Sequence, residues 1–331
     1  GPASILTSFY SPQDTFPQLA EFSVRPSPLN WVPLFRRDPR LALPFLPFAW
    51  SLRRKVRADV VICSSSGWSH GLRVCRGAIK VVYCHNPARW LYQTEDYLAG
   101  LPFFGRLALK LLRPLLIVWD QKAAASADVI IANSTSVADR VRKAYGREAE
   151  VVFPPVTIDP SGVSEAVEGI QQPFFLTVSR PRGYKGAELL IEAFRKLPDH
   201  RLVVVGSDSI KDCPTNVTCL GAISDAQIRW LYARARALVS VSREDFGLTP
   251  IEANAFGTPV LVLRAGGFLD STREGVSGHF IGEASIDEIV RAVTDFPKDW
   301  NRGAILAHAD LFNASSFSKR IHEIIEKISK T

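Results

Sequence analysis

The stretch SREDFGLTPIEANAFGTPVL, residues 242–261, carries two glutamates, Glu244 and Glu252. Between them a glycine turn, Phe246 to Pro250, leads into a helical run, Ile251 to Phe256. A turn that feeds a helix start gathers backbone N–H groups without intrahelical acceptors, and such groups bind phosphate. A carboxylate on either side accepts hydrogen bonds from hydroxyl groups. The stretch therefore predicts a site for a sugar nucleotide. On spacing alone, a plain helix start with acidic residues near its positive end explains it equally well.

Short apolar runs that end in small or polar residues occur on both sides of this stretch. Such runs, with helical segments between them, are typical of parallel strands and predict a doubly wound α/β architecture. We expect strands at 4–9, 59–66, 80–85, 128–134, 150–156, 174–179, 201–206, 217–221, 237–242 and 260–263. We expect helices at 107–125, 136–145, 187–197, 224–235 and 317–328.

Residues 157–172 are polar and rich in turn formers, which is typical of a linker. We therefore expect an N-terminal Rossmann-like domain at 1–156 and a C-terminal Rossmann-like domain at 173–310, with a C-terminal helix in 311–331. Ligands of such sheets bind beyond the carboxyl ends of the strands. Two of these domains facing across a cleft would place their strand-end residues around one ligand.

The composition favours an anionic partner for this chain. The 331 residues carry a formal net charge of +7, which suits nucleic acid, an acidic membrane surface or a phosphate-bearing substrate. The five cysteines are scattered and form no CxxC pair, so we expect reduced thiols and no zinc site. The alternative for Cys213 and Cys219 is that they approach each other. Neither a signal peptide nor an uninterrupted apolar run of spanning length occurs, and we expect a cytoplasmic protein.

A basic loop, SRPRGYKG at 179–186, follows one expected strand and precedes a helix. Arg180 offers a fork of donors for phosphate, and Lys185 supplies a compact positive charge. Two cations on one loop suffice to cover a diphosphate. The alternative is an ordinary basic surface loop.

Polar residues also end two expected strands of the first domain. His85 follows one of them, and Asn133 and Ser134 end the next. A lone histidine more often serves as a structural hydrogen-bonding group, but at a strand end it also suits a ligand site. In the second domain, Gly266 and Gly267 follow strand 260–263, which suits either a simple loop or close backbone approach to a ligand.

Residues 36–57 combine cations with large apolar side chains. The cations are Arg36, Arg37, Arg40, Arg53, Arg54, Lys55 and Arg57, and the aromatic residues are Phe45, Phe48 and Trp50. This mixture suits an anionic membrane surface and, equally, a solvated helix face with core anchors. Stacking on single-stranded nucleic acid fits less well, because the aromatic residues stand among prolines and leucines. We expect no nucleic-acid partner.

Together these residues resemble the family-4 retaining glycosyltransferases, which have the GT-B fold. The resemblance covers nearly the whole chain from residue 4, and its most specific part is EDFGLTPIEANAFGTPV, which is similar to the family's E-x7-E motif. SRPRGYKG is similar to the family's loop with a basic pair. YCHNPARWLY and IIANS look like motifs of its N-terminal domain, and the former resembles bacterial mannosyltransferases of polysaccharide assembly.

The resemblance implies an enzyme that moves a hexose from a nucleotide-diphosphate donor to a lipid-linked or polysaccharide acceptor, with retention. The first donor to expect is GDP-mannose, and the inner face of an anionic membrane is a suitable place of work for a peripheral protein. No DxD-like acidic pair ends a strand convincingly, so we expect neither a metal nor another cofactor.

The resemblance also assigns roles to individual residues. Arg180 and Lys185 would hold the donor diphosphate and stabilise it as the leaving group. Glu252 would bind the nucleotide ribose, and Glu244 would contact hydroxyls of the transferred sugar. The other candidates are the backbone N–H groups around Gly247, Leu248 and Thr249 for phosphate or sugar, His85 facing the sugar from the other domain, and Asn133 and Ser134 nearby.

One departure from the family pattern concerns the N-terminus. Family members normally begin with a strand and a glycine-rich loop that approaches donor phosphate and acceptor, and nothing before Ser4 matches that unit. We expect a chain without it to bind donor poorly. Two alternatives stay open, namely a nucleotide-sugar epimerase or phosphorylase of the same fold, and a non-catalytic basic scaffold for a membrane or nucleic acid.

Overall fold

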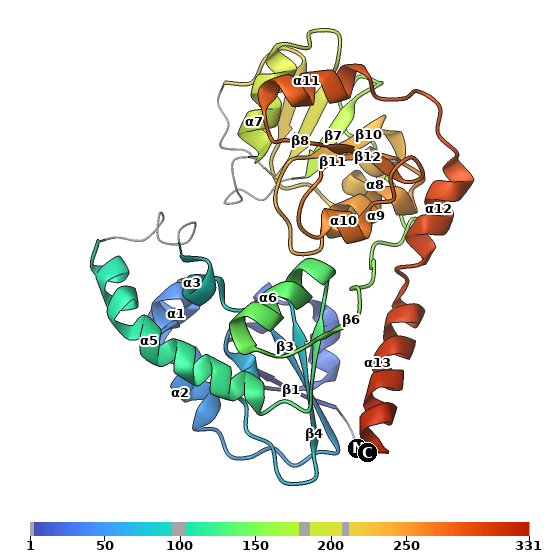
Figure 1. The fold of residues 1–331 in the computed structure, drawn as a ribbon. Coiled ribbons are helices and arrows are strands. Elements are labelled where there is room, and N and C mark those ends of the chain that lie inside the picture. The colour runs from blue at the N-terminus through green and yellow to red at the C-terminus, as the bar shows by residue number, and fades with distance from the viewer. Residues whose placement is uncertain (1–2, 95–102, 179–185, 207–211, 331) are drawn as a thin grey trace. The chain divides into compact units, whose positions relative to one another are not determined.

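The computed structural model describes residues 3–94, 103–178, 186–206 and 212–330 (Figure 1). The basic pair predicted at Arg180 and Lys185 lies outside the described residues. The chain divides into two compact units. Unit 1 comprises residues 1–133, 137–151 and 324–331, and unit 2 comprises residues 134–136 and 152–323.

Unit 2 contains a six-stranded parallel sheet in the order β12-β11-β10-β7-β8-β9. The chain runs from β7 outward to β9 and then returns to the opposite side of β7 with β10. The strand order therefore reverses between β7 and β10, and the crevice at such a reversal is where doubly wound sheets bind ligands. The strands are β7 (Phe175–Val178), β8 (Leu202–Val205), β9 (Val217–Leu220), β10 (Ala237–Ser240), β11 (Val260–Leu263) and β12 (Gly278–Ile281).

Both faces of this sheet are covered. Along β8, Leu202 and Val204 belong to one buried cluster and Val203 and Val205 to another, as expected when successive side chains alternate between two apolar faces. Helices α7 (Gly186–Arg195) and α11 (Ile286–Thr294) contribute to the first cluster, and α8 (Asp225–Arg234) and α9 (Leu248–Ala255) to the second. The remaining helices of the C-terminal half are α10 (Phe268–Ser271), α12 (Arg302–Asp310) and α13 (Ala314–Ser329).

Unit 1 contains a four-stranded parallel sheet in the order β3-β4-β5-β6 and a two-stranded parallel sheet, β1-β2. The strands are β1 (Ser4–Thr7), β2 (Ser23–Pro26), β3 (Val60–Ser65), β4 (Ile79–Cys84), β5 (Val129–Ala132) and β6 (Glu150–Val151). The α-helices are α1 (Pro33–Arg37), α2 (Leu46–Ser51), α3 (Arg89–Tyr92), α5 (Phe103–Ala125) and α6 (Thr135–Tyr145). Short 3-10 helices are η1 (Pro12–Asp14), η2 (Pro17–Glu21), η3 (Pro28–Trp31), η4 (Pro39–Ala42) and η5 (Ser69–Gly71).

Aromatic rings and a buried histidine–aspartate contact form part of the core of unit 1. The Trp68 ring lies 5.3 Å from that of Trp90 and 5.2 Å from that of Trp119, measured between centroids. Beneath them, His70 Nε2 lies 2.9 Å from Asp120 Oδ1, and both side chains are almost fully buried.

The predicted α/β architecture with two Rossmann-like sheets is confirmed, with differences in detail. The strand expected at 150–156 contains only Glu150–Val151, since Pro154 and Pro155 have no N–H to donate to a ladder. Strands β2 and β12 were not expected from the sequence. The interpretation of all five cysteines as reduced thiols is wrong for one pair, because a disulfide joins Cys213 to Cys219.

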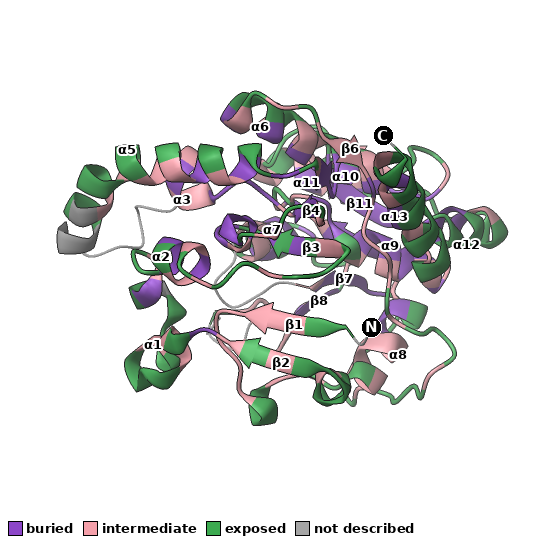
Figure 2. Cartoon of the chain, turned by 90° about the horizontal axis from the view of Figure 1, so that it is seen from below, coloured by how far each residue is buried: buried purple, intermediate pink, exposed green. Residues whose placement is uncertain are grey.

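The basic and apolar stretch at 36–57 divides into buried and exposed side chains. Leu46 and Trp50 belong to the core, as the interpretation with core anchors predicted. Phe45, Phe48 and Leu52 are exposed. Exposed residues also line much of α5 (Figure 2). In the described part of the chain, no helix combines the length and the apolar character needed to cross a bilayer.

Candidate functional site

The candidate site of unit 2 begins where β7 and β10 end side by side. These strands pair directly, with Leu238 opposite Leu176, so their carboxyl ends meet at the same edge of the sheet. Gly186, the first residue of α7, lies so close to Ser242 that a Cβ built on it would be 3.5 Å from the Ser242 backbone nitrogen. The start of α7 therefore lies beside the segment that leads to the two glutamates.

A serine pair orients Glu244 after the end of β10. Ser240 Oγ and Ser242 Oγ lie 2.9 Å apart, and Ser242 Oγ donates to Glu244 Oε1 at 3.0 Å. Glu244 is exposed. Its carboxylate is therefore held by one oxygen while it remains accessible to hydroxyl groups of a ligand.

Helix α9 starts at a glycine that no other residue replaces without strain. Gly247 has φ +87° and serves as the N-cap without any side-chain cap. A Cβ at this position would lie 2.6 Å from two ring atoms of Phe268. The amides of Leu248 and Thr249 begin the helix and have no intrahelical acceptor, which makes this end of α9 suited to an anion. A turn feeding a helix was predicted here, but the helix begins at Leu248, three residues before the expected Ile251.

The paired glycines after β11 pack against this turn. Gly267 N donates to Glu244 O at 2.9 Å. A Cβ on Gly267 would lie 2.1 Å from Phe246 Cα, and one on Gly266 would lie 2.5 Å from Glu244 O. The close approach suggested by the sequence is an approach to the backbone of residues 244–246, and contact of these glycines with a ligand stays a prediction.

Glu252 lies on α9 and is held by a tyrosine from α8. Tyr232 donates its hydroxyl hydrogen to Glu252 Oε2 at 2.7 Å. Burial raises the pKa of Glu252, and the hydrogen bond from Tyr232 lowers it in part. Burial also raises the pKa of Tyr232, and the negative charge of Glu252 raises it further. Among the described residues, Glu252 Oε1 has no hydrogen-bond partner, so it is available to accept from a hydroxyl.

In unit 1, the structure brings two predicted residues to neighbouring strand ends. His85 directly follows β4, and Ser64 Oγ lies 2.8 Å from its Nε2. Asn133 follows β5, and its backbone N–H donates to Cys84 O at 3.3 Å. The Asn133 side chain is buried, and its Oδ1 has no hydrogen-bond partner among the described residues, so a donor from a ligand would compensate it. Ser134 is fully buried.

Sequence reasoning missed the residues that position the two carboxylates. Ser242 stands only two residues before Glu244, and such short-range bonds from serine are a recognisable local signal. Tyr232 left no signal of this kind, because it is 20 residues from Glu252 and on another helix. No group of three or more His, Cys, Asp or Glu side chains in the described ranges is placed to hold a metal ion.

Solved structures with the same arrangement define the class of fold as GT-B. Sucrose-phosphate synthase from Thermosynechococcus elongatus is 17% identical, with a TM-score of 0.68, over 98% of this chain and 88% of that one. Anabaena HepE, solved in complex with UDP-glucose, is 18% identical, with a TM-score of 0.61, over 94% and 88% of the two chains.

Family models and curated relatives give the family. The model described as Glycosyltransferase Family 4 matches residues 5–160, and the model described as Glycosyl transferases group 1 matches residues 154–309. Between them, the two glycosyltransferase models match residues 5–309 of the chain. A D-inositol 3-phosphate glycosyltransferase from Mycobacterium tuberculosis is 28% identical over 239 residues, which is 62% of this chain and 48% of that protein. The chain thus spans about half the length of the curated relatives it matches.

Gly247 offers a test of the crowding at the start of α9. Gly275 also has a positive φ, +72°, but a Cβ there meets open space. Gly275→Ala should lower the free energy of unfolding by about 1 kcal/mol, from backbone strain alone. Gly247→Ala adds the overlap with Phe268 and should lower it by about 2 to 4 kcal/mol. Urea unfolding followed by circular dichroism measures both, and equal losses would contradict the crowding.

Glu252 offers a test through the pH dependence of stability. Its pKa is raised above the ordinary 4.5 by burial, so the ionised carboxylate costs stability once the pH exceeds the folded-state pKa. Below the ordinary pKa the carboxyl is neutral in both states, and that cost is absent. Glu252→Gln should therefore raise the melting temperature at neutral pH, with the gain disappearing as the pH falls below 4.5.

The matched control for this experiment is Tyr232→Phe. It removes the hydrogen bond that favours the Glu252 carboxylate and should destabilise the protein by about 1 kcal/mol at neutral pH. A Glu252→Gln protein that melts below the wild type at neutral pH, or whose gain does not change with pH, would refute the burial argument.

Proposed function

We propose that the protein transfers a sugar from a nucleotide-diphosphate donor to a lipid-linked or polysaccharide acceptor. The observation that carries the proposal is the grouping at the β7–β10 reversal. The free amides of Leu248 and Thr249, the exposed carboxylate of Glu244 and the tyrosine-held carboxylate of Glu252 all belong to one short segment there. That set offers donors to a phosphate and acceptors to hydroxyl groups on either side of it.

The residues of unit 2 take the following parts in this proposal. The start of α9 receives a donor phosphate. Glu252 accepts hydrogen bonds from the ribose, with its orientation fixed by Tyr232. Glu244 accepts from hydroxyls of the sugar. Arg180 and Lys185 complete the site as the cations expected to cover the diphosphate. His85 and Asn133 of unit 1, and Ser134, are proposed to contact the sugar.

The proposed reaction breaks the bond between the anomeric carbon and the diphosphate oxygen. The acceptor oxygen forms the new bond to that carbon and gives up its proton, and the nucleoside diphosphate leaves with the bonding electrons. Negative charge grows on the departing phosphate, and preorganised amides and fixed cations stabilise it without moving. Because these groups are part of the protein, we propose a metal-independent reaction without a cofactor. Retention of the anomeric configuration is part of the proposal and follows the family resemblance.

The donor base and sugar are proposed from likeness. GDP-mannose is the first donor to test, because YCHNPARWLY resembles bacterial mannosyltransferases. UDP-sugars are the second, because Anabaena HepE was solved with UDP-glucose. The name of the mycobacterial relative adds a phosphorylated polyol to the acceptors worth testing.

A ligand screen followed by a transfer assay tests the proposed function. The melting temperature should rise with the right partner among GDP, UDP, ADP and their sugars, since a ligand that binds only the folded state stabilises it. Lys185→Ala should weaken binding of that ligand about tenfold or more, because it removes one charge-assisted contact.

Lys196→Ala is the matched control, since Lys196 is an exposed lysine of unit 2 that pairs with Asp287. Labelled donor with lipid acceptors should then give labelled product. Release of nucleotide with inversion of a sugar centre and no acceptor would indicate an epimerase, and the absence of both binding and transfer with every donor would refute the proposal.

We further propose that the protein works on the cytoplasmic face of an anionic membrane as a peripheral protein. Two large apolar residues of α5, Leu111 and Leu115, stand one turn apart with 69% and 71% of their surface exposed. On α2 and just after it, Phe48 and Leu52 are exposed to 62% and 78%. Cations accompany both sets, among them Lys110 on α5. Apolar side chains with cations beside them suit the headgroup region of an anionic bilayer.

Leucine replacements test this surface. Leu111→Ser with Leu115→Ser should lower partitioning onto vesicles of phosphatidylcholine and phosphatidylglycerol about tenfold or more, since each leucine loses apolar burial. Leu306→Ser with Leu311→Ser removes two exposed leucines of unit 2 and serves as the control. Co-sedimentation measures both, and equal partitioning of all three proteins would contradict the assignment of this surface.

A further inference from the structure

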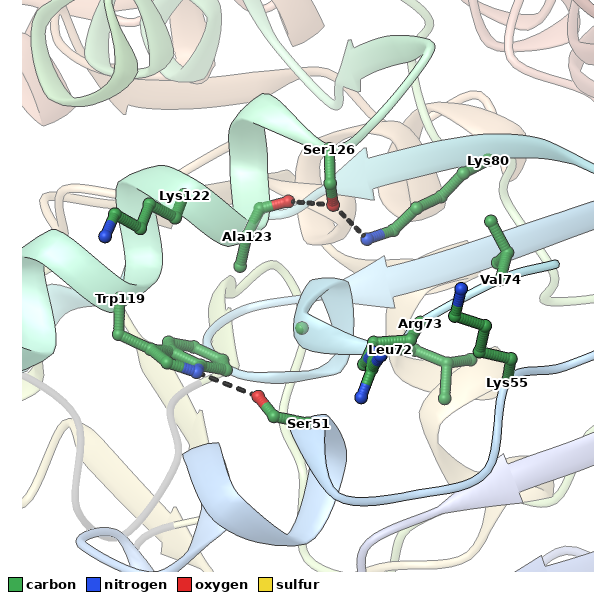
Figure 3. A pocket seen from close by; sticks show the side chains of 11 residues that line it. Ser51, Lys55, Leu72, Arg73, Val74, Lys80, Trp119, Lys122, Ala123 and Ser126 are labelled. Atoms are coloured by element: carbon green, nitrogen blue, oxygen red, sulfur yellow. Dashed lines mark hydrogen bonds between the residues drawn. The ribbon is translucent and has the colours of Figure 1, made fainter. Parts of the chain in front are cut away.

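A pocket of about 400 Å³ lies in unit 1 at the amino end of β4. Its wall includes the end of α2, residues 71–74 after η5, and the last turns of α5 (Figure 3). Lys80, the second residue of β4, contributes to the wall, whereas His85 follows the last residue of the same strand. The pocket is therefore at the opposite edge of the sheet from the predicted ligand residues of unit 1, and the proposed function does not use it.

The charge of this pocket has one sign. Four cations line it, namely Lys55, Arg73, Lys80 and Lys122, and the lining contains no Asp or Glu. In the described ranges, no carboxylate forms an ion pair with any of these four side chains. Like charges around one cavity repel one another, and an anion within it turns that repulsion into attraction.

Lys80 is the most buried of the four cations, with only 2% of its surface exposed. Its ammonium group donates to His70 O at 2.5 Å and to Ser126 Oγ at 2.7 Å, and both acceptors are neutral. Burial lowers the pKa of Lys80, while the nearby Asp128 charge raises it in part. Asp128 accepts from the Lys80 backbone N–H, at 2.7 Å. A buried cation held only by neutral groups gains from an anionic ligand.

The other lining groups are rigid or offer hydrogen bonds. Trp119 Nε1 donates to Ser51 Oγ at 2.8 Å, which ties α5 to α2 across one side of the pocket (Figure 3). Gly71 packs against the same indole, where a Cβ would lie 2.4 Å from a ring carbon. Ser126 places its hydroxyl beside the Lys80 ammonium group. Lys80 and Lys122 thus stand on a strand and a helix of the wall, whereas Lys55 and Arg73 approach the pocket from segments between elements.

We propose that this pocket binds a phosphate group. Phosphate matches the wall because it accepts several hydrogen bonds and carries the negative charge that an Arg fork and compact Lys charges favour. The volume exceeds what one phosphate needs and lies in the range of small-ligand sites, about 300 to 1,000 Å³. The phosphate therefore comes either free or on a lipid headgroup. The exposed Val118 and Leu115 on α5, just before Trp119, suit the lipid source.

Paired substitutions test the pocket against general surface charge. Lys55→Ala with Arg73→Ala removes two lining cations. Arg57→Ala with Arg76→Ala removes two exposed cations from the same segments that do not line the pocket. The probes are inorganic phosphate, measured by calorimetric titration, and vesicles of phosphatidylcholine with phosphatidic acid. Vesicles in which oleate supplies the same surface charge without an added phosphate monoester serve as the reference.

We expect the Lys55→Ala with Arg73→Ala protein to lose about tenfold or more in affinity for a phosphate probe, since hydrogen bonds to charged groups are strong. The second pair should change that affinity less than about twofold, as for screened surface charges. Binding of inorganic phosphate without a preference between vesicles identifies free phosphate, and preference for phosphatidic acid over oleate identifies a lipid headgroup. Equal losses in both pairs, or binding of neither probe by the wild type, would overturn the proposal.

Lys80→Met provides a second readout, because it keeps an apolar stem of similar length and removes the buried cation. It should also reduce phosphate binding about tenfold or more. Its melting temperature is measured first. If Lys80→Met does not fold, the comparison of Lys55→Ala with Arg73→Ala against its control pair decides the question. Donor binding in unit 2 should be unchanged in Lys55→Ala with Arg73→Ala, so failure of the pocket and failure of the proposed transfer are separable.

Discussion

Backbone contact between two loops sets the geometry of unit 2. The turn after β10 and the loop after β11 touch through main-chain atoms, with Gly267 N bonded to Glu244 O and no room for a Cβ on Gly267. Phe246 then enters a buried cluster with Ile251 and Phe312. With both sides of the turn fixed, Gly247 must take its positive φ and α9 must start at Leu248. Groups fixed in this way need no rearrangement when charge develops on a ligand.

Much of this could be read from the sequence, since the signals are local. Apolar runs predict buried strands, a Gly before a helical run predicts the start of α9, and Glu244 and Glu252 stand on either side of it. The parallel order then brings the ends of β7 and β10 together, as the rule for doubly wound sheets requires. Short strands such as β2 gave no comparable signal, because four residues with two of them exposed have little apolar pattern.

The parts that the sequence did not reveal depend on contacts between distant segments. Tyr232 reaches Glu252 from another helix, and the packing of Gly266 and Gly267 against residues 244–246 depends on the two loops lying together. The same glycines suggested a ligand contact because close approach is all that a pair of glycines indicates, whatever the neighbour is. Reduced thiols were favoured over a Cys213–Cys219 disulfide because composition and compartment argued for thiols, whereas the bond depends on how near the two residues lie in the fold.

Unit 1 shows why one strand has different chemistry at its two ends. The residues of β4 are buried from Lys80 to Cys84. Polar groups near either end of the strand therefore depend on protein partners more than on water. At the carboxyl end, His85 lies beside a serine hydroxyl. At the amino end, the Lys80 ammonium group donates to a carbonyl and a hydroxyl, and a carboxylate oxygen of Asp128 accepts from the Lys80 backbone N–H. A structural lysine needs only one paired carboxylate to be stable. Lys80 instead has neutral acceptors, and three further cations line the cavity beside it. An anion bound in the cavity would offset these like charges.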